Sequence, residues 1–169
     1  EVNAAREAAG NCNRSPWHSR LRIIHDSYQH YAIRSSEKFD LIITNPPYFI
    51  NDQKSRHQHL ALAKHNDHLP LTDLVYYSVP LLAETGRLAL ILPVKPAQQI
   101  MEIAGENGLF LNRLTEVAPD RIKGTHRYLM EFAKKKTIPE KDRLFIHLDD
   151  KSDYTEDYKK LTRDFYLKF

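Results

Sequence analysis

Cysteine and long apolar stretches are nearly missing from this sequence. Cys12 is the only cysteine among 169 residues, which excludes an intrachain disulfide. No apolar run approaches the roughly 20 residues that span a bilayer. The first residues also show no basic start, apolar middle and small-residue cleavage site of a secretory leader. These features predict a protein of the reducing cytoplasm with no membrane partner.

Glycine is also scarce. The five glycines include no G-x-G pair, so the sequence shows no glycine-rich loop that would cradle a nucleotide. Gly105 and Gly108 lie at the end of an expected helix and indicate a turn. The chain begins with Glu1 instead of methionine, and we expect it to be a fragment, incomplete at its N-terminus.

The overall amino-acid composition is that of an ordinary globular protein. The chain is 41% hydrophobic and 28% charged, and residues 1–169 suit a single domain with its own core. The net charge of +3 is a mild basic bias that does not by itself decide for a nucleic-acid partner. Basic clusters occur at Arg121–Lys123 and Lys134–Lys136; each is either a solvated loop or a contact to RNA phosphates.

Hydrophobic periodicity predicts helices that alternate with strands. Helices are expected at 1–14, at 71–82 with Gly86 as the stop, at 97–106, and after a cap at Thr155, and strands at 21–25, 39–44, 87–93 and 144–148. This alternation predicts an α/β fold with a mainly parallel, doubly wound sheet. Residues 111–117 and 128–133 predict an antiparallel hairpin near its end.

One motif suggests chemistry. Asn45-Pro46-Pro47-Tyr48 comes directly after the strand 39–44, and ligands bind beyond the carboxyl ends of strands in open α/β sheets. A double proline can also simply end a strand, so the four letters alone leave both interpretations open.

The chemistry of amine methylation favours the functional interpretation. An exocyclic amine needs acceptors for its two N–H groups, and the Asn45 side chain and the Pro46 backbone each offer a carbonyl. Pro46 and Pro47 fix φ and have no N–H, so the loop is rigid. Tyr48 can stack on a base that has left its own stack.

A strand followed by Asn-Pro-Pro-Tyr resembles the substrate side of the class I amino-methyltransferases. The wider context is similar to the tRNA(Val) adenine-37 N6-methyltransferase family. Four stretches carry this likeness: Asn13 to Trp17, Phe39 to Phe49, Ala63 to His65 with Leu69 to Leu74, and Tyr154 to Phe169. The resemblance implies a Rossmann-like class I fold and methyl transfer to N6 of an adenine in tRNA.

The resemblance also implies S-adenosylmethionine as cofactor. By position, Glu1 would bind its ribose hydroxyls and Asp26 its adenine, with Asn45 near the transferred methyl; Asp26 can also be a solvated turn residue. The family's first strand and glycine-rich loop are missing from the sequence, so we expect these 169 residues to bind the cofactor poorly.

Alternatives remain for the partner and the chemistry. A metal site is suggested by four histidines, His57, His59, His65 and His68. The tight ligand spacing typical of zinc sites is missing, however, and we expect no metal. The same motif would suit a DNA adenine or a protein glutamine amide, and a fragment without catalysis could still bind RNA. We expect a monomer that acts on tRNA.

Overall fold

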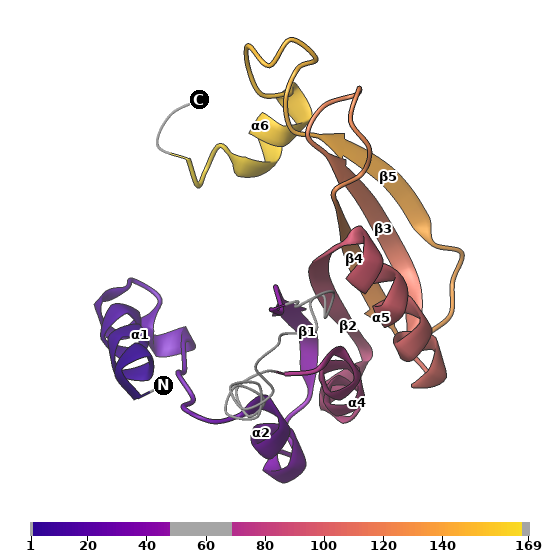
Figure 1. Ribbon diagram of the computed structural model, residues 1–169. Coiled ribbons are helices and arrows are strands. Elements are labelled where there is room, and N and C mark those ends of the chain that lie inside the picture. The colour runs from indigo at the N-terminus through magenta and orange to yellow at the C-terminus, as the bar shows by residue number, and fades with distance from the viewer. Residues whose placement is uncertain (1, 48–68, 167–169) are drawn as a thin grey trace, which may run out of the picture. The chain divides into compact units, whose positions relative to one another are not determined.

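The computed structural model describes residues 2–47 and 69–166 (Figure 1). It divides into two compact units, Glu1–Ser35 and Ser36–Phe169, each of which is described by itself. The expectation of one domain over residues 1–169 stays a prediction. In the described part of the chain, no helix is both long enough and apolar enough to cross a membrane.

The first unit is helical. It contains α1 (Val2–Arg14), the 3-10 turn η1 (His18–Arg20) and α2 (Tyr28–Arg34). The expectation of a strand at 21–25 is wrong, because this segment forms no strand and pairs with no described strand. A strand is held by hydrogen bonds to a neighbour. The sequence did not predict α2, whose first turn is capped by Ser27 Oγ accepting from the His30 amide at 3.1 Å.

The second unit is built on a five-stranded sheet. Its strands are β1 (Phe39–Thr44), β2 (Leu82–Pro93), β3 (Phe110–Ala118), β4 (Arg127–Ala133) and β5 (Glu140–Phe145), in the order β1-β2-β4-β3-β5. β1 and β2 pair in parallel, as do β3 and β5, whereas β4 runs antiparallel to both β2 and β3. The α/β class and the expected hairpin are confirmed. Among the described strands, however, parallel and antiparallel pairings are balanced, so this part of the sheet is mixed.

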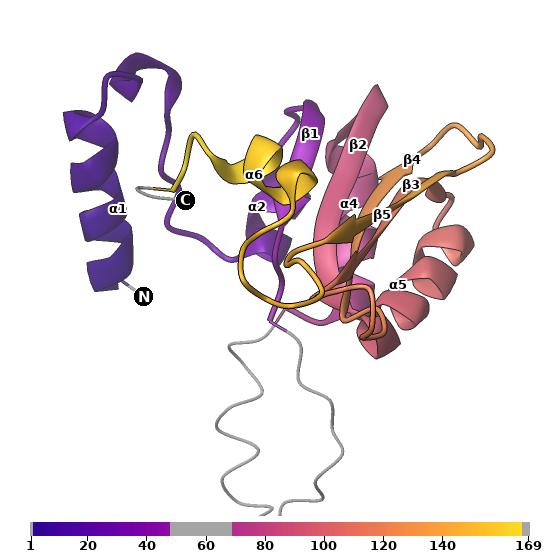
Figure 2. The ribbon, with the colours of Figure 1, turned by 90° about the horizontal axis from the view of Figure 1, so that it is seen from above.

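Two helices cover one face of the sheet (Figure 2). α4 (Leu71–Leu81) and α5 (Val94–Glu106) contact each other, and both contact β2. The core between helices and strands is apolar, and its fully buried members include Leu74, Val75, Leu88, Leu92, Ile100, Met130 and Phe132. The period of 3.6 in the helices and of 2 in the strands places these residues on facing sides.

Gly86 does not stop α4. The helix already ends at Leu81, where the amide of Leu82 bonds to Ser78 O, and Gly86 lies inside β2. A Cβ at Gly86 would lie 2.5 Å from Phe39 O, beside the register shift between Phe39 and Leu41. The glycine therefore serves the close approach of two strands, a role that the local sequence does not reveal.

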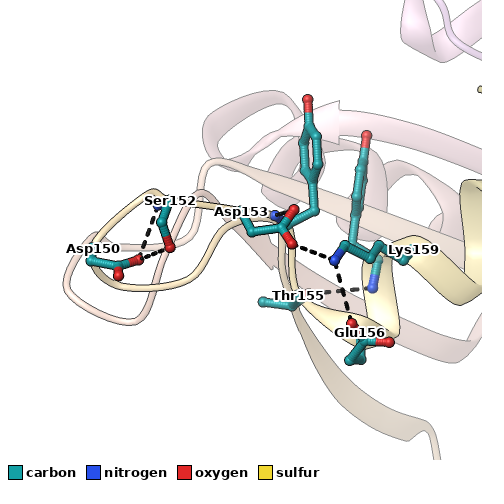
Figure 3. Close-up of polar contacts among 8 residues, drawn as sticks. Asp150, Ser152, Asp153, Thr155, Glu156 and Lys159 are labelled. Atoms are coloured by element: carbon teal, nitrogen blue, oxygen red, sulfur yellow. Dashed lines mark hydrogen bonds and ion pairs between the residues drawn. The ribbon is translucent and has the colours of Figure 1, made fainter. Parts of the chain in front are cut away.

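The C-terminal segment returns to the sheet through α6 (Glu156–Thr162), which contacts β5. Thr155 caps it as predicted, accepting from the Tyr158 amide at 3.3 Å and donating to Phe145 O at 2.5 Å. Figure 3 shows Lys159 between Asp153 and Glu156, at 2.5 and 3.4 Å. β5 covers Glu140–Phe145 instead of the expected 144–148, and beyond it the amides of Ile146 and His147 still bond to Ala118 O and Pro119 O.

An aromatic stack follows along the same segment. The ring of Tyr154 stacks on His147 at 4.7 Å between centroids and on Tyr158 at 5.2 Å. The Tyr158 hydroxyl bonds to that of Tyr166 at 2.8 Å, and this contact, with partial burial, raises the pKa of Tyr158 to about 12. The stack thus ties the described end of the chain to α6.

Candidate functional site

The motif lies at the carboxyl end of β1. Thr44 pairs with Leu90 of β2, and Asn45 is the first residue after the strand. Asn45 and Pro47 are exposed, whereas Pro46 between them is buried. With the residues that the structure describes, the Asn45 side chain forms no hydrogen bond. A buried proline thus anchors the turn, and an exposed amide stands beside it with its carbonyl available to a ligand.

Other loops share this edge of the sheet. β2 runs three residues beyond Leu90 to Pro93, where α5 begins, and Pro93 pairs with Arg127 at the start of β4. Arg127 in turn pairs with Val117 near the end of β3. The loops after β1, β3 and β5 therefore open at the same edge, which is where open α/β sheets bind ligands.

Asp26 has a defined environment in the first unit. Its Oδ1 accepts from the Ser27 amide at 2.9 Å and contacts His30 Nδ1 at 2.8 Å, and its side chain is 14% exposed. The hydrogen bond with His30 lowers the pKa of Asp26, with further contributions from Ser27 and Arg34. The carboxyl group is thus ionised at neutral pH and acts only as an acceptor.

The second oxygen of Asp26 still has acceptor capacity. Its Oδ2 lies 2.7 Å from Arg34 Nη2, as an ion pair without hydrogen-bond alignment, and it is buried without a hydrogen-bond donor among the described residues. A buried acceptor of this kind fits the amino group of an adenine.

Comparisons with known proteins now decide the family. Residues 4–106 match the model of the Eco57I restriction-modification methylase family. The chain is 37% identical over 169 residues to the tRNA1(Val) (adenine(37)-N6)-methyltransferase of Trichodesmium erythraeum, covering 100% of this chain and 70% of that protein. It is 33% identical to the enzyme of the same name from Vibrio parahaemolyticus, covering 99% and 69%. The chain belongs to this methyltransferase family.

The fold agrees with that membership. A crystal structure described as a predicted O-methyltransferase from Agrobacterium tumefaciens superposes with a TM-score of 0.68 at 16% identity, covering 96% of this chain and 74% of that one. This likeness supports the fold alone. The expected resemblance and the class I methyltransferase fold are confirmed, and S-adenosylmethionine is the methyl donor of this class of enzyme.

The structure describes some of the predicted site residues of the methyltransferase but not all of them. Asn45, Pro46 and Pro47 lie together, whereas Tyr48 and Glu1 are outside the described residues. Asp26 and Asn45 fall in different units, so the structure does not place them together. The four histidines between 57 and 68 also lie outside. In the described ranges, no group of three His, Cys, Asp or Glu is arranged to hold a metal.

Sequence reasoning missed one residue at this edge of the methyltransferase. Asp120, in the loop after β3, is 2% exposed, and its Oδ1 accepts from the amides of Ile122 and Lys123 at 3.1 and 2.8 Å. Aspartate commonly bonds to amides two and three residues on in turns. The Pro119-Asp120 pair was the available signal, but burial of the carboxylate depends on packing that the sequence does not display.

Proposed function

We propose that the full-length protein transfers a methyl group from S-adenosylmethionine to N6 of an adenine in tRNA, at position 37 of tRNA-Val. The observation that carries the proposal is the turn Asn45-Pro46-Pro47, exposed at Asn45 and anchored at Pro46, at the carboxyl end of β1. The relatives that share this chain over nearly its whole length have that activity in their names, which supports the same substrate.

The residues of the motif would position the acceptor amine. The Asn45 side-chain carbonyl and the Pro46 backbone carbonyl accept its two N–H groups, which directs the nitrogen lone pair away from them. When bound, S-adenosylmethionine would supply an electrophilic methyl group, toward which these acceptors would orient the amine lone pair. Pro47 keeps the turn rigid, and Tyr48 would stack on the extruded base.

Two acidic residues would contact the cofactor. Asp26 Oδ2 is an ionised, buried acceptor suited to the adenine amino group, and Glu1 would take the ribose hydroxyls. We further propose that the protein acts in the cytoplasm as a monomer without a metal ion.

The test is methyl transfer by the full-length protein from labelled S-adenosylmethionine to tRNA. Asn45→Ala removes the side-chain acceptor, and we expect kcat to fall by about 10²–10³-fold, the usual cost of losing one polar group at a reacting centre. Asn45→Asp keeps an acceptor oxygen and should lose less. The melting temperature reports folding, because Asn45 is exposed. Wild-type kcat in Asn45→Ala would refute the assigned role.

A second acceptor has some support. The matching Eco57I model describes a restriction-modification methylase, which favours DNA adenine as the alternative. Offering the enzyme separate pools of tRNA, DNA and protein measures the choice directly. Label in tRNA alone supports the proposal, label in DNA or in glutamine amides replaces it, and RNA binding without label indicates a binding protein.

A further inference from the structure

The loop between β3 and β4, residues 119–126 with Arg127 at its end, lies at the edge that carries Asn45. We propose that this loop, which we call the β3–β4 loop, contacts the phosphate backbone of the tRNA through Arg121, Lys123 and Arg127, and that Asp120 holds it in shape. The inference rests on the proposed function, since it names the surface that would bind the same substrate.

The register of the sheet fixes where the loop stands relative to the motif. Arg127 is two strands away from β1, through β2 and β4, and three residues beyond the row of Thr44 and Leu90. These steps correspond to about 10 Å across the sheet and about 10 Å along it. The resulting separation between Thr44 and Arg127 is about 14 Å, which equals about four nucleotides of a stacked strand. RNA that presents a base at Asn45 can therefore reach the loop.

The loop is held at both ends. The His126 amide bonds to Val117 O at 2.9 Å, and the His147 amide bonds to Pro119 O at 2.8 Å. Asp120 fastens the middle through the amides of Ile122 and Lys123, while its carboxylate is buried. The tip from Arg121 to Gly124 is exposed. Such a rigid loop presents its cations without a large ordering cost on binding.

Two cations of the loop, Arg121 and Lys123, form no ion pair with the described residues, and the acids near the loop accept hydrogen bonds. Within the described chain, Lys123 has no acidic partner, and the Arg121 guanidinium lies 5.7 Å over the ring of Phe145. Asp149 on the neighbouring loop accepts from the Arg121 amide at 3.1 Å. Asp150 Oδ1 accepts from the Ser152 hydroxyl and amide at 2.7 and 3.0 Å, and Figure 3 shows this pair.

The other basic cluster of the second unit provides a contrast. Lys134 Nζ donates to Leu82 O at 3.0 Å, and Lys136 lies over the ring of Phe110 at 5.7 Å. Both follow Ala133, which pairs with Arg87 and Phe110 at the opposite edge of the sheet from Asn45. Lys135 between them is exposed and belongs to no proposed site. It is a matched control for Lys123.

The first experiment measures binding of tRNA-Val to full-length protein by fluorescence anisotropy, together with methyl transfer. We expect Lys123→Ala to raise Kd about fivefold and Lys123→Glu about twentyfold, and Lys123→Ala to lower the slope of log Kd against log salt by about 0.7–0.9. In the methyl-transfer assay both Lys123 variants should raise KM for tRNA. Lys135→Ala and Lys135→Glu should change neither Kd nor kcat.

The outcomes separate the two proposals. Equal Kd values for Lys123→Glu and Lys135→Glu would overturn the loop assignment while leaving methyl transfer intact. Selective weakening by Lys123→Glu in a protein that transfers no methyl would keep the loop and refute the proposed function. A wild-type protein that binds no tRNA would overturn both.

Asp120 has its own test as a positioning residue. Asp120→Ala removes a negative charge, so electrostatics alone predicts tighter tRNA binding. If the carboxylate holds the loop, binding instead weakens several-fold, and Asp120→Asn, which keeps the acceptor oxygen, restores it. Tighter binding by Asp120→Ala would refute the positioning role. Should Asp120→Ala fail to fold, Asp120→Asn, which also removes the charge but keeps the acceptor oxygen, must still bind tRNA at least as tightly as the wild type.

Discussion

At Gly86 two strands approach so closely that a single carbon atom decides their spacing. The position that a Cβ would occupy is 2.5 Å from Phe39 O and 3.0 Å from the Ala83 amide nitrogen, both backbone atoms that cannot rotate away. The register shift in β1 falls at the same place. Gly86 therefore controls how β1, and with it Asn45, joins the sheet.

Substituting this glycine should destabilise the protein. We expect Gly86→Ala to lower the free energy of unfolding by about 1–3 kcal/mol, the range found for overpacked sites. Urea denaturation of both variants measures it. Gly105→Ala is the control, since nothing lies within 4 Å of its added carbon inside α5. That change should be neutral or stabilise by about 0.5–1 kcal/mol. Equal effects at both glycines would contradict the steric argument.

At the scale of the element, α6 depends on its cap. Thr155 Oγ1 accepts from the Tyr158 amide and donates to Phe145 O at the end of β5. We expect Thr155→Ala to reduce the free energy of unfolding by about 1 kcal/mol and Thr155→Ser to restore most of it. Thr137→Ala, at an exposed position without such a bond, is the control in the same denaturation series. No difference between Thr155→Ala and Thr137→Ala would dismiss the cap.

The elements also show what the sequence predicted and what it did not. The cap at Thr155 and the β3–β4 hairpin were predictable because their signals are local. The segment 21–25 has strand-like residues without a described partner, so the strand predicted there was wrong for want of tertiary information. α2 was missed because its seven residues are too few for a helical period to stand out. A glycine after an apolar helical pattern usually ends the helix, but Gly86 instead allows two strands to approach closely.

The candidate site follows the same division. The place of Asn45 after a strand was predictable because the apolar run before it is continuous. The role of Asp120 was not, because its burial arises only when β3 and β5 bring their following loops together. The acceptor capacity of Asp26 likewise depends on how His30 and Arg34 turn back onto it from α2.

At the scale of the whole molecule, the proposals assign different tasks to different parts of the chain. Asp26 in the first unit would hold the methyl donor, Asn45 would hold the amine, and the β3–β4 loop would hold the RNA backbone. If these tasks are separate, a substitution in one part should affect one ligand and spare the other.

Binding of each ligand to the full-length protein tests this separation. At a donor concentration of 100 Kd, S-adenosylmethionine should stabilise the wild type by about 2.7 kcal/mol. Asp26→Asn removes the charge of the acceptor; if Kd rises tenfold, that stabilisation falls to about 1.4 kcal/mol. The Kd for tRNA should not change. Lys123→Glu should show the opposite pattern, with full stabilisation by the donor and weaker tRNA binding. Thermal unfolding with and without donor, and anisotropy with tRNA, measure the two properties. If either variant loses both, the donor and RNA surfaces are not separate, because one substitution then disturbs the fold that both share.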